Sequence, residues 1–387
     1  MTWWRAVSVI SNNVENHFDR LKFSFKKRFN HFDPLQILPY DGYGTRRKLY
    51  LKGRVLEDKG IIAFENLADN ETIWNNLLNM YRRLESDEIP DARLLARFNE
   101  IELKLKTDEE GYFDLSLDLP QPLESPDIWQ SVEFELLEPK LTGQTTIRAT
   151  GQILLPPPEA KFGIISDIDD TVIETSATQL LKMARIVFLG NARTRLPFKG
   201  VASFYKALQQ GQDSQTYNPL FYISSSPWNL YDLLVDIFRL QNIPRGPLFL
   251  RDYGLSPQEL LPLGHKEYKL IQIQKVLETY TQLPFVLLGD SGQEDPEIYH
   301  EVVKRYPGRI LAIYIRDVAS KAQDKHMLTL IESLTGAGVE MLFVSDTVAA
   351  AEHAAQKGLI PQTALPDIRL DKALDEKEPT QVEQILS

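Results

Sequence analysis

The chain of 387 residues contains no cysteine. This absence excludes disulfides, thiol catalysis, and zinc or iron–sulfur sites that use cysteine as a ligand. No apolar run reaches transmembrane length, and the N-terminus lacks the apolar core and small-residue cleavage site of a signal peptide. An excess of positive charge is absent as well, and the net charge of -11 argues against non-specific nucleic-acid binding. We therefore expect a cytoplasmic protein that has no nucleic acid as a partner.

Residues 1–35 predict an amphipathic N-terminal helix. Apolar side chains recur at three- and four-residue intervals between Trp3 and Phe25, and several lysines and arginines lie on the other face. A basic amphipathic helix that carries tryptophan can lie on anionic lipid, which would place the protein peripherally at a membrane. The alternative is that the apolar stripe packs on the protein's own core or on a second subunit, and the sequence leaves both interpretations open.

Residues 36–158 predict a smaller, mostly-β domain of the sandwich type. Short alternating segments separated by turn signals indicate its strands: Lys48–Val55, Ile101–Leu105, Tyr112–Leu119, Val132–Leu136 and Thr145–Leu155. The spacing of apolar residues in Ile73–Phe98 predicts a helical insertion. Three successive prolines at 156–158 predict a stiff hinge. No spacing in this region points to catalysis, so we expect a structural or binding role for it.

Residues 159–362 alternate between strand and helix patterns, which predicts an α/β domain with a mainly parallel sheet and helices on both faces. The predicted strands are Gly163–Ser166, Leu220–Ser224, Leu248–Arg251, Phe285–Leu288, Ile310–Ile315 and Met341–Val344. The predicted helices include Val201–Gln209, Trp228–Gln241, Lys266–Tyr280, Pro296–Tyr306 and Thr347–Lys357. The remaining residues, 363–387, are acidic and lack a core pattern, so we expect a mobile tail.

The chemistry of the α/β domain is indicated by the segment Lys161–Thr171, KFGIISDIDDT. A short apolar run stops at three carboxylates, Asp167, Asp169 and Asp170. Ligands of open α/β sheets bind at the carboxyl ends of the strands, so Asp167 and Asp169 lie where such a sheet does its chemistry. Like charges this close need a cation, a shared proton or a phosphate partner.

Three interpretations of this acidic segment compete. The first is a solvated acidic turn. The second, a calcium loop of the D-x-D-x-D-G type, fails because Val172 stands where that loop has glycine and Thr178 where it has glutamate. The third is a nucleophilic aspartate with a second, acid/base aspartate around Mg2+. Three later segments favour the third interpretation.

The segment Leu220–Ser226, LFYISSS, is again an apolar strand that ends in small hydroxyl residues. Ser224 ends the strand, and Ser225 and the N-terminus of the next helix offer hydroxyl and N–H groups suited to a phosphate. The alternative is that these serines are simple N-caps.

The segment GHKEYK opens the following helix and places Lys266 in its first turn. A cation there works against the helix dipole, so it usually has an anionic partner. The alternative is an ordinary surface lysine, and Lys269, three residues on, is the rival candidate for a phosphate site.

The last segment, Phe285–Asp295, reads FVLLGDSGQED and is a buried strand pattern followed by an acidic cluster. Asp290 at its end could complete a Mg2+ site of hard oxygen ligands with Asp167. A second carboxylate of the cluster, Asp295, lies close by in the sequence.

In chain order the segments read strand–DxDxT, strand–Ser, Lys and strand–GDxxxxD, and this combination resembles the haloacid-dehalogenase (HAD) phosphatases. Over about residues 155–320 the chain closely resembles the catalytic domain of the actin-patch phosphatidate phosphatase family, relatives of the lipins. The stretches that carry this resemblance are FGIISDIDDTV, GNARTRLPFKGV, FYISSSPWNLYDLL, GHK and FVLLGDSGQEDPEIY. The segment PYDGYGT also looks like what bacterial members carry ahead of that domain.

The resemblance implies a Mg2+-dependent phosphatase that works through an aspartyl-phosphate. Asp167 is then the nucleophile, and Asp169 protonates the leaving oxygen and deprotonates the hydrolytic water. Mg2+ is held by the Asp167 carboxylate, the main-chain carbonyl of Asp169 and Asp290, and Asp295 orients the metal shell.

The same resemblance implies how the phosphate is bound. Ser224 hydrogen-bonds a phosphoryl oxygen, Lys266 pairs with the phosphate and the nucleophile, and Thr171 closes the turn. Arg193 and Arg195 lie in an apolar and basic stretch that suits an amphiphilic phosphate. The alternative is a cap that packs on its own sheet with salt-bridged arginines.

The resemblance implies the reaction more firmly than the substrate. Phosphatidate or a related lipid phosphate is the first candidate, and a HAD phosphatase acting on a soluble phosphoester is the second. A catalytically idle phospholipid-binding module is a third, which the intact Asp167/Asp169 pair disfavours because a binding module has no need of an acid/base group.

Overall fold

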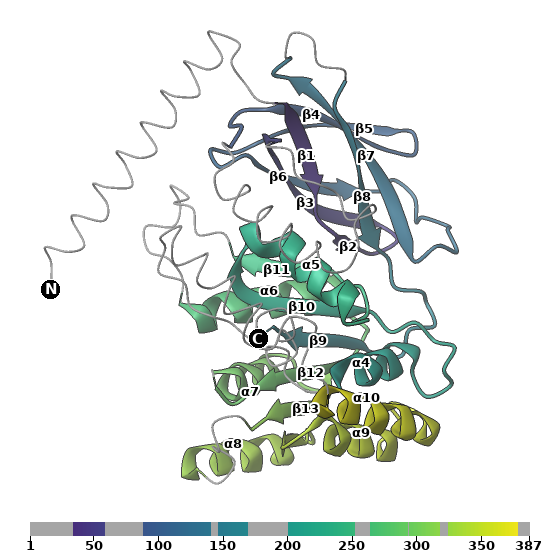
Figure 1. The fold of residues 1–387 in the computed structure, drawn as a ribbon, viewed down its shortest axis with the longest axis vertical. Helices are drawn as coiled ribbons and strands as arrows, with labels where there is room; N and C mark the ends of the chain where they lie inside the picture. The colour runs from purple at the N-terminus through teal and green to yellow at the C-terminus, as the bar shows by residue number, and fades with distance from the viewer. Residues whose placement is uncertain are drawn as a thin grey trace, which may run out of the picture.

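Two structural units make up the described part of the chain (Figure 1). The computed structural model describes residues 34–58, 88–140, 146–168, 200–251, 264–292, 294–317 and 324–377. A β unit precedes Gly163, and an α/β unit begins there. The predicted N-terminal helix lies outside the described residues, so its contact with a membrane stays a prediction. Among the described helices, none combines the length and the apolar character needed to cross a membrane.

The β unit is built on one mixed sheet of eight strands. The strands are β1 (Leu35–Pro39), β2 (Gly42–Gly44), β3 (Lys48–Glu57), β4 (Arg93–Phe98), β5 (Ile101–Lys106), β6 (Tyr112–Asp118), β7 (Trp129–Glu138) and β8 (Arg148–Leu154). They pair in the order β1-β3-β2-β8-β7-β4-β5, with β6 on β3, and the β2–β8 pair is parallel. The faces of β6 and β7 meet in one core, where the rings of Phe113 and Phe134 are 5.2 Å apart.

The predicted helical stretch Ile73–Phe98 is wrong at its C-terminal end, which is strand β4. This strand pairs antiparallel with β5 on one side and β7 on the other. Its side chains at alternate positions, Leu94, Ala96 and Phe98, are buried in the core of the sheet. The helical spacing of the apolar residues is outweighed because two neighbouring strands satisfy the backbone of β4 and cover these side chains. Residues 59–87 lie outside the described part of the chain.

The α/β unit contains a parallel sheet of six strands in the order β11-β10-β9-β12-β13-β14. The strands are β9 (Gly163–Asp167), β10 (Leu220–Pro227), β11 (Leu248–Arg251), β12 (Phe285–Asp290), β13 (Ile310–Arg316) and β14 (Met341–Val344). Each contains one of the predicted strands, and the predicted parallel sheet is confirmed. Apolar runs such as that of β9 form strands here because both faces of the sheet are covered.

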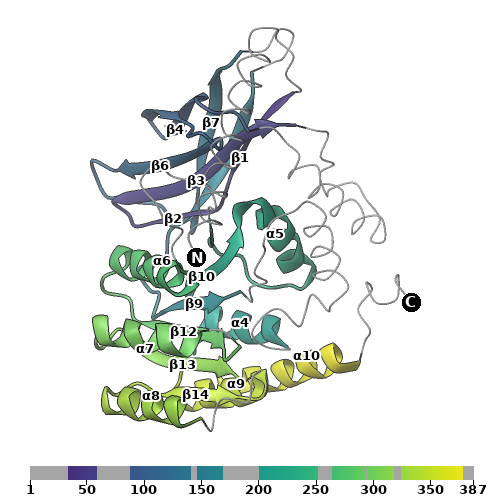
Figure 2. The same cartoon turned by 90° about the vertical axis from the view of Figure 1, so that its left-hand side faces the viewer.

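Helices cover both faces of this sheet, as predicted (Figure 2). The helices are α4 (Val201–Gln210), α5 (Tyr231–Leu240), α6 (His265–Thr279), α7 (Asp295–Arg305), α8 (Lys325–Gly336), α9 (Thr347–Gln356) and α10 (Leu365–Lys377). One apolar core joins α6, α7 and α8 to one face of the sheet, and another joins α4, α5, α9 and α10 to the opposite face. A single turn of 3-10 helix, Trp228–Leu230, lies between β10 and α5.

The expectation of a mobile tail over residues 363–387 is wrong for its first half, which is helix α10. Ile368 on this helix is 1% exposed and packs in the same core as α4 and α9. The helix also makes two ion pairs with the α9 region, Arg369–Glu352 at 2.7 Å and Lys372–Asp346 at 2.8 Å. Charged residues dominate the sequence of α10, but a few well-placed contacts anchor it.

Replacing Ile368 by alanine should lower the free energy of unfolding by about 2–4 kcal/mol, because it leaves a cavity in the core between α10, α4 and α9. Urea denaturation measures the change. The matched control is Leu370→Ala on the same helix, where the side chain is 60% exposed. Equal effects of the two substitutions would show that α10 is not anchored in this core.

Candidate active site

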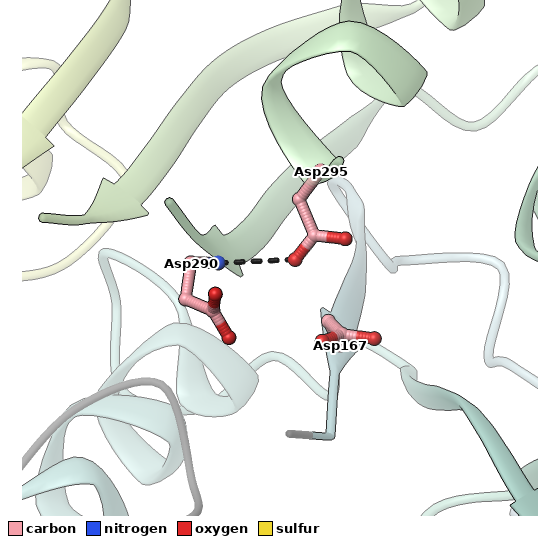
Figure 3. Close-up of side chains that lie close together, drawn as sticks. All are labelled: Asp167, Asp290 and Asp295. Carbon is pink, nitrogen blue, oxygen red and sulfur yellow. Dashed lines mark hydrogen bonds between the residues drawn. The ribbon is translucent and has the colours of Figure 1, made fainter. Parts of the chain in front are cut away.

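Three carboxylates gather at the carboxyl edge of the parallel sheet. Asp167 is the last residue of β9, Asp290 is the last residue of β12, and Asp295 is the first residue of α7. One oxygen from each lies within 4.8 Å of the others, and all three residues are buried. Figure 3 shows the three side chains together, with the hydrogen bond of 3.0 Å that the main-chain N–H of Asp290 donates to Asp295. The fold therefore brings Asp167, Asp290 and Asp295 together, as we expect from the sequence.

Gly289 makes the approach of Asp295 to the sheet possible. A Cβ atom at position 289 would lie 2.5 Å from the Asp295 Oδ2 atom and 3.0 Å from its Cγ. Any side chain there would push the carboxylate away from the ends of β9 and β12. The glycine of the GD pair thus has a steric role, because it leaves room for the carboxylate of a residue six positions later.

The cation of this site is Lys269, on helix α6. Its Nζ atom lies 2.6 Å from Asp167 Oδ1 and 3.0 Å from Asp295 Oδ1, and its side chain is 3% exposed. Burial works against the charge of Lys269, but the ion pairs with Asp167 and Asp295 outweigh it and raise the pKa of the ammonium group. The lysine stays charged and holds the carboxylates of β9 and α7 together.

Lys269 pairs with two of the three buried carboxylates, Asp167 and Asp295. Burial, followed by the charge of Asp295, raises the pKa of the Asp167 carboxyl well above its usual range. The Oδ2 atom of Asp167 is buried and has no hydrogen-bond partner among the described residues. A cluster of carboxylate oxygens with spare negative charge and an unsatisfied oxygen is the donor set that a hard divalent cation prefers. The described residues therefore fit a Mg2+ ion.

Ser224 and Ser225 lie beside this cluster in the sheet. Strand β10 runs parallel to β9, with Ile223 opposite Asp167, so both serines follow at the same edge. Their side chains are buried, and the Ser224 Oγ atom accepts a hydrogen bond of 3.0 Å from the N–H of Ser226. We call Ser224–Ser226 the serine loop. Strand geometry continues through it to Pro227, three residues beyond the predicted strand end.

The lysine that pairs with Asp167 in the described residues is Lys269, the rival candidate, rather than Lys266. Lys266 lies three residues before Lys269, in the first turn of α6, and is only partly buried, whereas Lys269 faces the carboxylates. The other predicted site residues, Asp169, Thr171, Arg193 and Arg195, lie outside the described part of the chain. Their roles stay predictions.

Two buried hydroxyl contacts behind the site were not found from the sequence. The Ser166 Oγ atom donates a hydrogen bond of 2.9 Å to the Asp167 main-chain oxygen and lies 2.6 Å from Tyr205 Oη on α4. At the end of β12, Ser291 donates to Asp317, which follows β13, at 3.1 Å. A serine within an otherwise apolar strand, as at position 166, is the signal that could have indicated the first contact, since a buried hydroxyl needs a partner.

The fold and the site define an α/β protein with a buried acidic centre and a paired lysine at the carboxyl edge of its parallel sheet. Residues 162–317 match the family model described as "Phosphatidate phosphatase APP1, catalytic domain", so this segment of the chain is similar to that family. The match begins just before β9 and ends just after β13, so it includes every strand and helix that contributes to the acidic centre.

Two relatives extend this comparison. The chain is 34% identical over 164 residues to phosphatidate phosphatase APP1 of Saccharomyces cerevisiae, an alignment that covers 42% of this chain and 27% of the yeast protein. It is 27% identical over 237 residues to an uncharacterised protein of Schizosaccharomyces pombe, which covers 61% of this chain and 37% of that protein. The chain thus matches only about a third of the length of these relatives.

The solved structures resemble this chain only distantly. A carbohydrate acetylesterase from Xanthomonas citri has a TM-score of 0.27 and 10% sequence identity, over 85% of this chain and 71% of that one. This likeness is too distant to support the fold or the function.

Replacing Lys269 by methionine should lower the free energy of unfolding by about 3–5 kcal/mol, because two buried carboxylates lose their cation. The measurement is urea denaturation in the presence of EDTA, so that no divalent cation can substitute for the lysine. Lys266→Met on the same helix is the matched control and should change stability little. A larger loss of unfolding free energy in Lys266→Met than in Lys269→Met would contradict the assignment of Lys269 to this site.

Proposed function

We propose that this protein is a Mg2+-dependent phosphatase of the HAD type, which hydrolyses a phosphomonoester, with phosphatidate or a related lipid phosphate as the substrate. The observation that carries the proposal is the buried ion pair between Asp167, at the end of the first strand of the α/β unit, and Lys269. This pair lies in the segment that matches the family model of the phosphatidate phosphatase catalytic domain. The name of the yeast relative supports the substrate class.

Asp167 is the proposed nucleophile. Its carboxylate oxygen attacks phosphorus and forms an aspartyl-phosphate, while the bond from phosphorus to the substrate oxygen breaks. Asp169 gives a proton to the departing alcohol and later takes one from the water that hydrolyses the aspartyl-phosphate. The two products are the alcohol, which is diacylglycerol when the substrate is phosphatidate, and inorganic phosphate.

Lys269 takes the role that the sequence had suggested for Lys266. Its ammonium group is paired with the proposed nucleophile, so its charge favours the ionised form of Asp167 that attacks, whereas burial and the charge of Asp295 favour the protonated form. The same charge attracts the phosphate dianion to the edge of the sheet. Ser224, at the end of the adjacent strand, is the proposed hydrogen-bond donor to a phosphoryl oxygen.

Asp167, Asp290 and Asp295 are the described residues that would hold Mg2+, together with the main-chain carbonyl of Asp169. When bound, the ion screens the nucleophile from the negative phosphate and stabilises charge on the transferring group. Asp295 also accepts hydrogen bonds from Lys269 and from the N–H of Asp290. It therefore orients the groups around the ion, whichever of its oxygens coordinates.

The substitutions Asp167→Asn and Asp169→Asn should each lower phosphate release at least about a thousandfold, because an amide is neither a nucleophile nor an acid/base group. Assays should use phosphatidate in mixed micelles and a panel of soluble phosphates. Asp118→Asn, a 79% exposed carboxylate on β6, is the control and should keep full activity. Substantial activity in either site variant would exclude this mechanism, and a wild-type preference for soluble phosphates would exclude the lipid substrate.

Mg2+ should raise the melting temperature of the wild-type chain, because the ion binds the folded state and relieves the repulsion among the three carboxylates. Asp290→Asn should need at least about tenfold more Mg2+ for the same rise, since it removes one charged ligand. EDTA should abolish activity. A melting temperature that is independent of Mg2+, combined with full activity in EDTA, would contradict the metal-dependent proposal.

A further inference from the structure

Arg54 is a buried cation in the β unit. It belongs to strand β3, and it is 6% exposed. The guanidinium group donates hydrogen bonds to the Glu110 main-chain oxygen at 2.9 Å and to Glu88 Oε1 at 3.0 Å, and it lies 4.5 Å from the centre of the Tyr112 ring. These groups hold its plane in one orientation, so its remaining donor points in a fixed direction.

The remaining donor of Arg54, its Nη1 atom, contacts the α/β unit. The Arg54 Nη1 atom donates a hydrogen bond of 2.6 Å to the side-chain oxygen of Asn229. Asn229 lies in the 3-10 turn that follows the serine loop, three residues after Ser226. A charged donor held on three other sides forms a strong and directional hydrogen bond to the amide oxygen. The position of Asn229 is therefore set by the β unit.

A second set of contacts holds the same turn. The ring of Tyr40, which follows β1, stacks on Trp228 at 4.5 Å with an interplanar angle of 14°. The main-chain N–H of Asp41 donates a hydrogen bond of 2.8 Å to Tyr231 Oη, and the Asp41 carboxylate accepts two hydrogen bonds, of 2.7 and 2.6 Å, from Arg245. The turn is thus held on both sides of Asn229 by residues far from it in the sequence.

The serine loop lies at the irregular end of strand β10. The pairing of β10 with β11 is irregular between Ile223 and Pro227, the stretch that contains the three serines. An irregular strand end can adopt more than one geometry unless a neighbour selects one. The turn that the β unit holds begins directly after Pro227, so it is the neighbour that can select the geometry of the loop.

We propose that Arg54 is a positioning residue for the serine loop and acts through Asn229, so that phosphate binding in the α/β unit depends on the β unit. This inference rests on the proposed function, in which Ser224 contacts the phosphoryl group. Arg54 touches neither the substrate nor the acidic centre. It fixes the turn after the loop, and the loop presents its hydroxyl and N–H groups to the phosphate.

The test compares two substitutions at one position in the full chain. Asn229→Ala removes the acceptor and leaves Arg54 with its partners in the β unit. Asn229→Asp keeps an acceptor of the same shape. Arg54→Lys removes the planar fork and serves as a second variant. Arg97→Ala is the control, because Arg97 makes comparable ion pairs, with Glu135 and Glu102, entirely within the β unit.

Two measurements are made on each variant in the presence of Mg2+. The first is kcat/KM for the best soluble phosphate, together with the inhibition constant of inorganic phosphate. The second is hydrogen–deuterium exchange of the amides of residues 224–231, which does not depend on turnover. Asn229→Ala should lower kcat/KM about tenfold and weaken phosphate inhibition, as a small misplacement of binding groups does. It should also speed exchange in residues 224–231 without a matching change in β3.

Asn229→Asp should restore both measurements toward the wild-type values, and Arg97→Ala should leave both unchanged. Wild-type kinetics and exchange in Asn229→Ala would overturn the inference, and so would faster exchange with unchanged kcat/KM. A wild-type chain that hydrolyses no phosphate would overturn the proposed function. In that case the exchange data alone decide whether Arg54 and Asn229 hold the loop.

Discussion

The ion pairs of Lys269 with Asp167 and Asp295 are the interaction on which the site depends. Three carboxylates without a cation could not remain together in a buried place, because desolvation and mutual repulsion would protonate them or drive them apart. The lysine on α6 joins a carboxylate from β9 to one from α7. The parallel sheet makes this possible, since it brings the carboxyl ends of β9 and β12 to one edge and the starts of α6 and α7 to the same edge.

The β unit and the α/β unit are joined by polar and by aromatic contacts. Arg54, Tyr40 and Asp41 hold the turn that follows the serine loop. A groove of about 430 Å³ runs between the two units along β11, and the three carboxylates are not part of its lining. The two units also share apolar packing, since Tyr40 and Tyr112 lie in one core of the α/β unit and Leu154 in the other.

Much of the fold was predictable because its signals are local. Each strand of the parallel sheet is an apolar run that ends at a turn, a glycine or a charge, and two of the predicted strands, Leu248–Arg251 and Met341–Val344, have the observed bounds. The predictions of secondary structure are wrong where contacts between residues distant in the sequence determine the local structure. Strand β4 has a helical spacing of apolar residues, but its pairing with β5 and β7 makes it a strand. Helix α10 is highly charged, and the buried residues Leu365 and Ile368 anchor it together with two ion pairs.

The residues of the site can likewise be divided into those that the sequence predicts and those that depend on the tertiary structure. The sequence by itself determined Asp167, Asp290 and the serines, because each follows directly on an apolar run and the carboxyl ends of parallel strands share an edge. Only the tertiary structure decided which lysine pairs with the carboxylates. Lys266 and Lys269 are three residues apart on one helix, and the packing of α6 against β10 and α7 turns Lys269 toward the carboxylates. The contact between Arg54 and Asn229 was equally beyond the sequence, because a contact across 175 residues leaves no local pattern.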